Sequence, residues 1–220
     1  QPAAATSHGD PAPHRAPTVI AADKLIWQGK AEATKMAVLW TVGEDVGRLL
    51  MLPAKSRGRP STDLHDRVAI QLDAKPHVEL IAMGGPPQDG IECHAAAPCT
   101  FYEHTIPRGQ QSAGSLAWEP YGPDRQFAPA WGTVETGSFG VFVELKPSTA
   151  TFWHMHGHDV RMVVLAGTVE YAQSGDPAFT LTPGSYVSQQ GGYKHSERCT
   201  SASGCVLYIH GDYGFDVRPM

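Results

Sequence analysis

The feature that most constrains the fold is an internal repeat. The stretch CHAAAPCTFYEH (93–104) resembles CTSASGCVLYIH (199–210), and in each a Cys-x5-Cys pair is followed by Tyr three residues later and His two after that. Upstream, two pairs of tryptophans are each separated by 13 residues: Trp27 and Trp40, then Trp118 and Trp131. Two landmarks in the same order indicate that one structural unit is used twice.

The repeat predicts how the chain is divided. We expect a first copy over residues 19–110 and a second over 111–220, with IPRGQQSAG as the linker between them. The preceding residues, 1–18, are rich in Ala and Pro without an apolar period, and predict a mobile N-terminal tail. With 220 residues, of which 41% are hydrophobic, the chain is long enough for two cores.

The local patterns are those of short strands. GVFVELK (140–146) alternates apolar and other residues, RMVVLAGTVEY (161–171) is rich in β-branched residues, and CVLYIHG (205–211) reads as a further strand. The 23 glycines and 18 prolines supply frequent turns, and no segment has a long helical period. The sequence therefore predicts an all-β fold with a barrel or sandwich in each copy.

The four cysteines fall at equivalent places in the two copies. Opposed residues of an antiparallel pair lie about 4.5–5.5 Å apart at Cα, which a disulfide can bridge. We expect the disulfides Cys93–Cys99 and Cys199–Cys205, with a zinc site or free buried cysteines as alternatives. Disulfides favour a periplasmic or secreted protein, and the first residues, QPAAATSHGDPAPHRAP, are consistent with an export signal already removed.

Charge and hydropathy limit the classes of partner that we expect this protein to bind. The net charge is −5 and no basic stripe is present, so we expect no nucleic-acid partner. No apolar run approaches the roughly 18 residues that span a bilayer, so we expect no membrane partner. A small-molecule substrate or ligand is the expected partner, and a homodimer is left open.

The stretch FWHMHGHDVRMVVLAG (152–167) holds alternating histidines. His154 and His156 would point to one face of a strand, about 7 Å apart along the chain. His195 follows a glycine turn and would lie on a neighbouring strand. Three imidazoles at such positions can bind one ion at about 2.0–2.1 Å each. Aligned on Gly47 and Gly140, the first copy has Ser61, Asp63 and His65 where the second has the three alternating histidines, so we expect the first copy to lack a full metal site.

These histidine stretches resemble the motifs of the cupins. HMHGHDVRMVVLAG is similar to the first cupin motif and GSYVSQQGGYKH (184–195) to the second, with Gln190 where proline is usual. The duplication resembles bicupins, in particular a two-domain, anti-sigma-factor-like family. The resemblance implies two tandem jelly-roll β-barrels, with one metal in the second barrel on His154, His156 and His195. The motif's glutamate falls on Val160, so the expected site has three histidines and no carboxylate.

Two further histidines are candidate catalytic residues. His158 is either a fourth ligand or a hydrogen-bonding residue, and its counterpart in the first copy favours the second role. His210 recurs as His104, which favours a framework hydrogen bond first and an acid/base role second. Arg161 lies next to the motif and would form an exposed salt bridge or bind a substrate carboxylate.

The predicted cofactor is one divalent transition metal, Fe, Zn, Ni, Cu or Mn, because imidazole ligands suit these ions better than Mg or Ca. Open coordination positions favour a metal-dependent enzyme on a small oxygenated or carbonyl-bearing molecule. By analogy with similar three-histidine cupins, a dioxygenase is the leading activity. The alternatives are a non-catalytic metal-binding or small-ligand sensing protein, or a metal-dependent hydrolase, lyase or isomerase.

Overall fold

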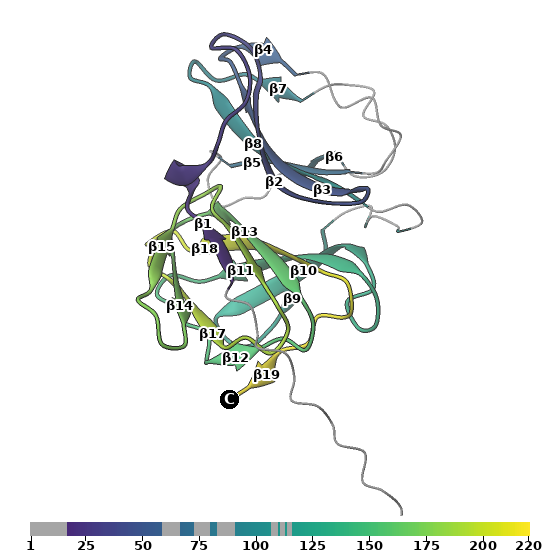
Figure 1. Cartoon of the computed structure of the whole chain (residues 1–220), viewed down its shortest axis with the longest axis vertical. Coiled ribbons are helices and arrows are strands. Elements are labelled where there is room, and N and C mark those ends of the chain that lie inside the picture. The colour runs from purple at the N-terminus through teal and green to yellow at the C-terminus, as the bar shows by residue number, and fades with distance from the viewer. Residues whose placement is uncertain are drawn as a thin grey trace, which may run out of the picture.

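A computed structural model describes residues 17–58, 67–72, 80–82, 91–106, 110, 113 and 116–220. The predicted tail up to residue 16, most of the linker and the aligned positions Ser61, Asp63 and His65 lie outside the described residues. Figure 1 shows two β-rich lobes, the first half of the chain above the second. Among the described residues the one helical element is a single 3-10 turn, η1 (Ala22–Lys24). No described helix has the length and apolar character needed to cross a bilayer.

The second half of the chain forms a closed pair of sheets. The larger sheet contains, in spatial order, β1 (Thr18–Ile20), β16 (Tyr186–Gln189), β13 (Val160–Ala166), β18 (Cys205–Gly211), β11 (Phe139–Leu145), β10 (Arg125–Gly132) and β9 (Glu119–Pro120). The smaller sheet contains β15 (Phe179–Leu181), β14 (Val169–Gln173), β17 (His195–Cys199), β12 (His154–Met155) and β19 (Arg218–Pro219). Val141, Val143 and Leu145 share one face of β11 and pack into the core between the sheets, as the alternation predicts.

The first half repeats this plan in a reduced form. Its main sheet has the order β2 (Lys35–Val42), β3 (Asp45–Leu52), β8 (Cys99–Thr105), β5 (Arg67–Gln71) and β6 (Leu80–Ala82). A two-stranded sheet of β4 (Ser56–Arg57) and β7 (Glu92–Cys93) lies across a small apolar core. The prediction of an all-β fold with a repeated barrel-like unit is confirmed.

The duplication is visible in the strand register. The order β2, β3, β8, β5 corresponds to β10, β11, β18, β13, and both first pairs have a register shift just before a tryptophan, Trp40 or Trp131. Each tryptophan lies over a glycine of the next strand, Gly47 or Gly140, where a Cβ would overlap the indole ring. Each of these glycines pairs with the repeated histidine of its own copy.

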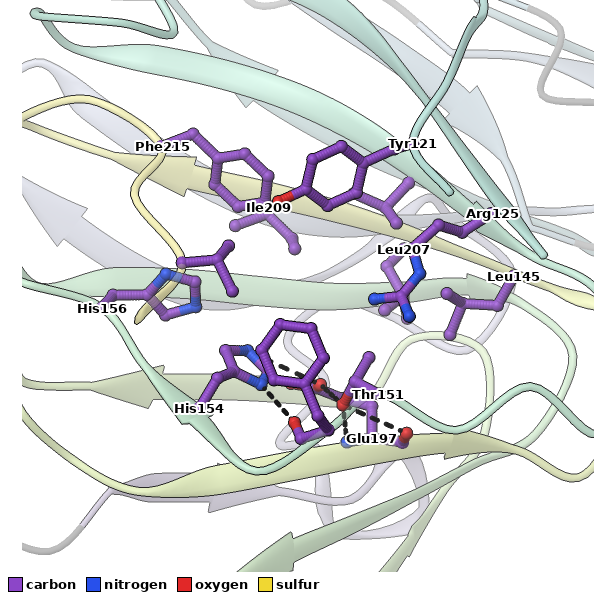
Figure 2. Close-up of a pocket in the computed structure, with 13 residues that line it drawn as sticks. Tyr121, Arg125, Leu145, Thr151, His154, His156, Glu197, Leu207, Ile209 and Phe215 are labelled. Atoms are coloured by element: carbon purple, nitrogen blue, oxygen red, sulfur yellow. Dashed lines mark hydrogen bonds and ion pairs between the residues drawn. The ribbon is translucent and has the colours of Figure 1, made fainter. Parts of the chain in front are cut away.

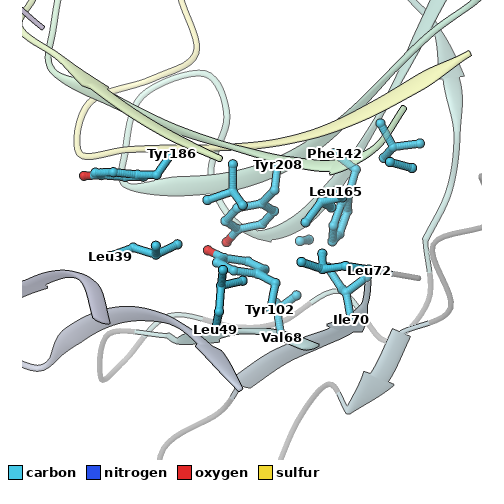
Figure 3. Close-up of a cluster of buried hydrophobic side chains, with 14 of the residues drawn as sticks. Leu39, Leu49, Val68, Ile70, Leu72, Tyr102, Phe142, Leu165, Tyr186 and Tyr208 are labelled. Carbon is cyan, nitrogen blue, oxygen red and sulfur yellow. The ribbon is translucent and has the colours of Figure 1, made fainter. Parts of the chain in front are cut away.

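The largest apolar cluster lies between the two halves (Figure 3). It combines side chains of both main sheets, including Leu49 and Tyr102 from the first half and Phe142, Leu165 and Tyr208 from the second. The chain also crosses this interface, because β1 lies at the start of the first copy but pairs with β16 of the second. A shared core of this kind ties the folding of one half to that of the other.

Both predicted disulfides are present. Cys93–Cys99 and Cys199–Cys205 join residues whose Cα atoms are 5.6 and 5.7 Å apart. Each bridge closes the short connection that leads into β8 or β18, at the equivalent place in each copy. Two disulfides indicate an oxidising, extracytoplasmic environment.

Candidate metal centre

The three predicted ligands come together inside the second barrel. His154 on β12 and His195 on β17 are directly opposed across the strand pair, and His156 follows one residue after β12 ends. Their ring centroids lie 4.2 Å (154 to 195), 5.2 Å (154 to 156) and 5.3 Å (156 to 195) apart. One nitrogen from each ring falls within 4.8 Å of the others, and all three side chains are buried.

Hydrogen bonds from the backbone orient each ring. Nδ1 of His154 lies 2.9 Å from the Phe152 carbonyl oxygen, and Nδ1 of His195 lies 3.1 Å from that of Tyr193. Nδ1 of His156 lies 2.6 Å from the carbonyl oxygen of Asp216. Because a carbonyl oxygen only accepts, Nδ1 carries a proton in each ring, and Nε2 of the neutral His154 and His156 rings keeps its lone pair. Metal-binding histidines are typically oriented in this way.

A carboxylate that sequence analysis missed lies beside the three rings. Glu197 Oε1 is 3.2 Å from His195 Nε2, and Glu197 Oε2 is 3.9 Å from His154 Nε2. Thr151 holds this carboxylate in place by donating a hydrogen bond of 2.8 Å to Oε2. Glu197 is two residues after His195 on one strand, so strand alternation would have placed both on the same face. The expected ligand set contains no carboxylate, and Glu197 lies directly beside it.

The four groups divide into neutral and charged members. Burial lowers the pKa of His154 and lowers that of His156 to about 4, so both rings are neutral at pH 7. Burial alone would raise the pKa of Glu197, but the adjacent His195 lowers it to about 2. Burial opposes protonation of His195 as well, yet the Glu197 carboxylate raises its pKa above the usual value. The centre therefore offers two neutral imidazoles beside a buried anion.

A small apolar pocket opens onto this centre (Figure 2). Its cavity measures about 50 Å³, and His154, His156 and Glu197 form one part of the wall. The remaining lining residues are mostly apolar or aromatic: Val143, Leu145, Leu207, Ile209, Phe152, Phe215, Val217 and Tyr121, with Thr151 and Arg125. The C-terminal segment takes part, because the Asp216 carbonyl orients His156 and β19 pairs with β12.

A second buried cluster lies between the two halves. Asp45, His104 and His210 also bring their ligand atoms within 4.8 Å of one another, so by composition both clusters could bind a metal ion. His104 Nε2 is 2.8 Å from Asp45 Oδ1, and His210 Nε2 is 3.2 Å from Asp45 Oδ2 without the alignment of a hydrogen bond. Trp40 donates a hydrogen bond of 2.8 Å to the same carboxylate.

The hydrogen-bond partners distinguish this cluster from the three histidines. Nδ1 of His210 faces the Arg161 guanidinium at 3.4 Å, and a guanidinium only donates, so Nδ1 accepts and Nε2 carries the proton. Nε2 of His104 faces a carboxylate, which only accepts, so it also carries the proton. Arg161 adds a positive charge 3.8 Å from Asp45. The Arg161 charge favours a charge-compensated hydrogen-bond network around Asp45, whereas the neutral His154 and His156 rings make the three histidines the better candidate for a metal.

The structure separates the two other predicted histidines from the metal centre. His158 is exposed and its ring centroid lies 4.8 Å from that of Tyr213. His210 belongs to the network around Asp45, in line with a framework role. The expectation of an exposed salt bridge for Arg161 is wrong, because its side chain is 13% exposed and lies in the interface between the halves. Neither histidine joins the three rings in the described part of the chain.

The fold and the centre define the class of the protein. Two tandem jelly-roll barrels, one with three buried histidines on its first and second motifs, give the chain the two-barrel fold of the bicupins. Residues 110–213 match the family described as ChrR cupin-like domain, so the anti-sigma-like resemblance of the second barrel is confirmed. No curated protein matches the chain.

Solved structures extend the likeness to the whole chain. A putative glyoxylate-induced protein from Pseudomonas aeruginosa aligns over 96% of this chain and 96% of its own, at 12% identity and a TM-score of 0.61. The protein Ylba from E. coli aligns over 93% and 94%, at 11% identity and a TM-score of 0.59. A salicylate 1,2-dioxygenase from Pseudoaminobacter salicylatoxidans, solved with gentisate, aligns over 90% and 82%, at 11% identity and a TM-score of 0.54. Identities this low show the fold alone.

Proposed function

We propose that the protein is a mononuclear metal-dependent cupin enzyme that acts on a small oxygenated or carbonyl-bearing molecule, and that its reaction is a dioxygenation. The observation that carries the proposal is a group of three buried imidazoles, each with Nδ1 on a backbone carbonyl and each with one ring nitrogen within 4.8 Å of the others. This donor set fits a divalent transition metal of the Fe, Zn, Ni, Cu or Mn group. The site residues in this proposal are His154, His156 and His195.

A bound redox-active metal would supply Lewis acidity and the capacity to activate oxygen beside a chelating substrate. The chain's own contribution is to hold and shield the reactants. Glu197 provides a negative charge that offsets the metal's charge, and Thr151 fixes its orientation. Its place beside the rings of His195 and His154 makes this role electrostatic. The apolar walls of the pocket exclude water from the substrate.

Several observations support an enzyme over a closed structural site. A structural zinc site is surrounded by four protein ligands, whereas a catalytic one keeps a position open to the pocket. Here His154 and His156 form part of a cavity wall, so a ligand in the pocket reaches the centre. The salicylate 1,2-dioxygenase that shares this fold was solved in complex with gentisate. By analogy of fold alone, we infer that this protein acts on a small oxygenated molecule.

The test is elemental analysis of protein produced without added metal, followed by oxygen uptake of the iron-loaded protein with diketones and catechols. We expect close to one metal ion per chain and substrate-dependent oxygen consumption. His195→Ala should remove the metal, whereas His94→Ala, at a side chain that is 85% exposed, should keep it. Recovery of zinc alone, with no oxygen uptake after iron loading, would refute the dioxygenase and favour a binding protein, hydrolase, lyase or isomerase.

The ligand set has its own test in the same samples. His158→Ala should leave metal content unchanged, because this side chain is exposed and lies against Tyr213. Loss of metal in His158→Ala, or full retention in His195→Ala, would show that the three named histidines are not the set that binds the ion.

A further inference from the structure

The pocket above the three histidines contains a cation that the proposed metal centre does not use. Arg125 is the first residue of β10, and its side chain is 15% exposed. Its guanidinium lies 5.9 Å from the centre of the Phe152 ring, and Figure 2 shows the side chain pointing into the pocket. A guanidinium in a mostly apolar wall has lost much of its water and retains a strong demand for negative charge.

Within the protein, the Arg125 guanidinium is only partly paired with a negative charge. Nε of Arg125 lies 3.3 Å from Asp124 Oδ1, on a side chain that is 38% exposed. The terminal amino groups of Arg125 have no hydrogen-bond partner among the described residues. Glu197, the carboxylate among the described lining residues, is committed to His195 at 3.2 Å and to Thr151 at 2.8 Å. Arg125 therefore keeps donors that a ligand can fill.

We propose that Arg125 binds the carboxylate of a small acid with an apolar body, whose other end carries the oxygen that reaches the three histidines. This inference rests on the proposed function and names the substrate class of the same site. The guanidinium offers two parallel donors that match a carboxylate, and the surrounding leucines, isoleucine and aromatic rings match the apolar body.

The pocket also indicates which acids are disfavoured. Arg125 is the one Arg or Lys among the described lining residues, so a phosphate or a dicarboxylate would bring a second charge without a partner. The cavity is small, at about 50 Å³. The ligand that fits is a short monocarboxylate with a ketone or hydroxyl group.

The experiment compares oxo acids with their neutral amides on zinc-loaded protein, because zinc does not turn the ligand over. Pyruvate, 4-oxopentanoate and 5-oxohexanoate are each titrated against the matching amide by calorimetry. We expect at least one acid to bind ten-fold or more tightly than its amide, the range for a charge-assisted hydrogen bond. Arg125→Gln should abolish that preference without changing zinc content, and Arg125→Lys should retain part of it. The matched control is Arg198→Gln, an exposed arginine of β17, which should keep the full preference.

The outcomes separate this inference from the proposed function. Zinc binding with no acid preference, or a preference that persists in Arg125→Gln, would overturn the role of Arg125 and leave the metal centre intact. An acid preference that depends on Arg125 in a protein that binds no metal would support the carboxylate site and refute the metal-dependent enzyme. Partial retention of the acid preference in Arg125→Lys would show that the loss in Arg125→Gln is not caused by misfolding.

Discussion

Replacing Asp45 by asparagine is predicted to destabilise the protein by about 2 kcal/mol at pH 7. Burial would raise the pKa of Asp45, but hydrogen bonds and charges from His104 and His210 lower it from 3.8 to about 2. A difference of nearly two pKa units between the folded and unfolded chain corresponds to about 2 kcal/mol in favour of the ionised, folded form. Asparagine keeps an oxygen for Trp40 but loses the charge that faces Arg161 at 3.8 Å.

The sign of the pH dependence follows from the lowered pKa. The contribution of Asp45 is complete above about pH 4 and is lost as the pH falls through 2, so about 1 kcal/mol should remain at pH 3. Urea unfolding followed by circular dichroism at pH 7, 5 and 3 measures the difference between wild type and Asp45→Asn. A difference that is near zero at pH 7, or equal at pH 7 and pH 3, would refute the network described for Asp45.

The same samples test the rival assignment of a metal to this cluster. A charge-compensated network holds no ion, so a chelator should leave the contribution of Asp45 unchanged. If a chelator lowers the stability of wild type and not that of Asp45→Asn, the cluster binds a metal and the protonation deduced for His104 and His210 is wrong.

Three further predictions concern the second half of the chain. Removing the second disulfide by Cys199→Ala with Cys205→Ala should cost about 2 kcal/mol of unfolding free energy, because it closes a loop of only seven residues; urea unfolding at pH 7 measures it, and an unchanged midpoint would contradict it. Glu197→Gln should weaken metal binding about 10–100-fold in a competition titration with a chelating dye, the range for removing a polar partner of a metal site, whereas Glu170→Gln should have no effect. Burial, followed by the nearby His104, lowers the pKa of His210 to about 3. The contribution of His210 to the unfolding free energy is therefore complete above about pH 6.5 and is lost as the pH falls towards 3. His210→Gln should lose less stability than wild type between pH 7 and pH 4, and parallel pH profiles would rule this out.

The fold class was predictable because the sequence contains two copies of the same structural unit. Strand alternation in GVFVELK, the glycine turns and the Cys-x5-Cys pair indicate a β-rich unit in the second copy. The recurrence of the Cys-x5-Cys pair indicates that the first copy has the same kind of fold. The sequence did not predict that β1 would pair with β16, because a three-residue strand has no period and its partner lies more than 160 residues away. Nor could composition show that the largest core lies between the copies, since strands such as β11 are apolar on both faces.

The site was predictable where the spacing was local. His154, His156 and His195 are carried by two short motifs, and the structure brings their rings together. Glu197 was missed because the cupin motif places its glutamate at the position of Val160, on β13. Glu197 lies on β17 in the other sheet, two residues after His195. Arg125 was missed for a different reason, since it lies 29 residues before the first motif and only strand pairing brings β10 to the pocket.

The packing of the two copies explains why some residues repeat and others do not. The halves meet through equivalent faces, so the rings of His104 and His210 lie 4.8 Å apart, and Trp40 contacts His210 while Trp131 contacts His104. Such reciprocal contacts are expected where two copies of one unit pack about a two-fold axis.

Two charged residues break that symmetry. Asp45 aligns with Ser138, and Arg161 aligns with Val68, so each copy contributes one charge of opposite sign to the shared cluster. Packing two first copies or two second copies in this way would bury Asp45 or Arg161 without its partner, which is strongly unfavourable. The repeated aromatic and histidine residues therefore build the interface, and this unrepeated pair favours packing of a first copy against a second copy.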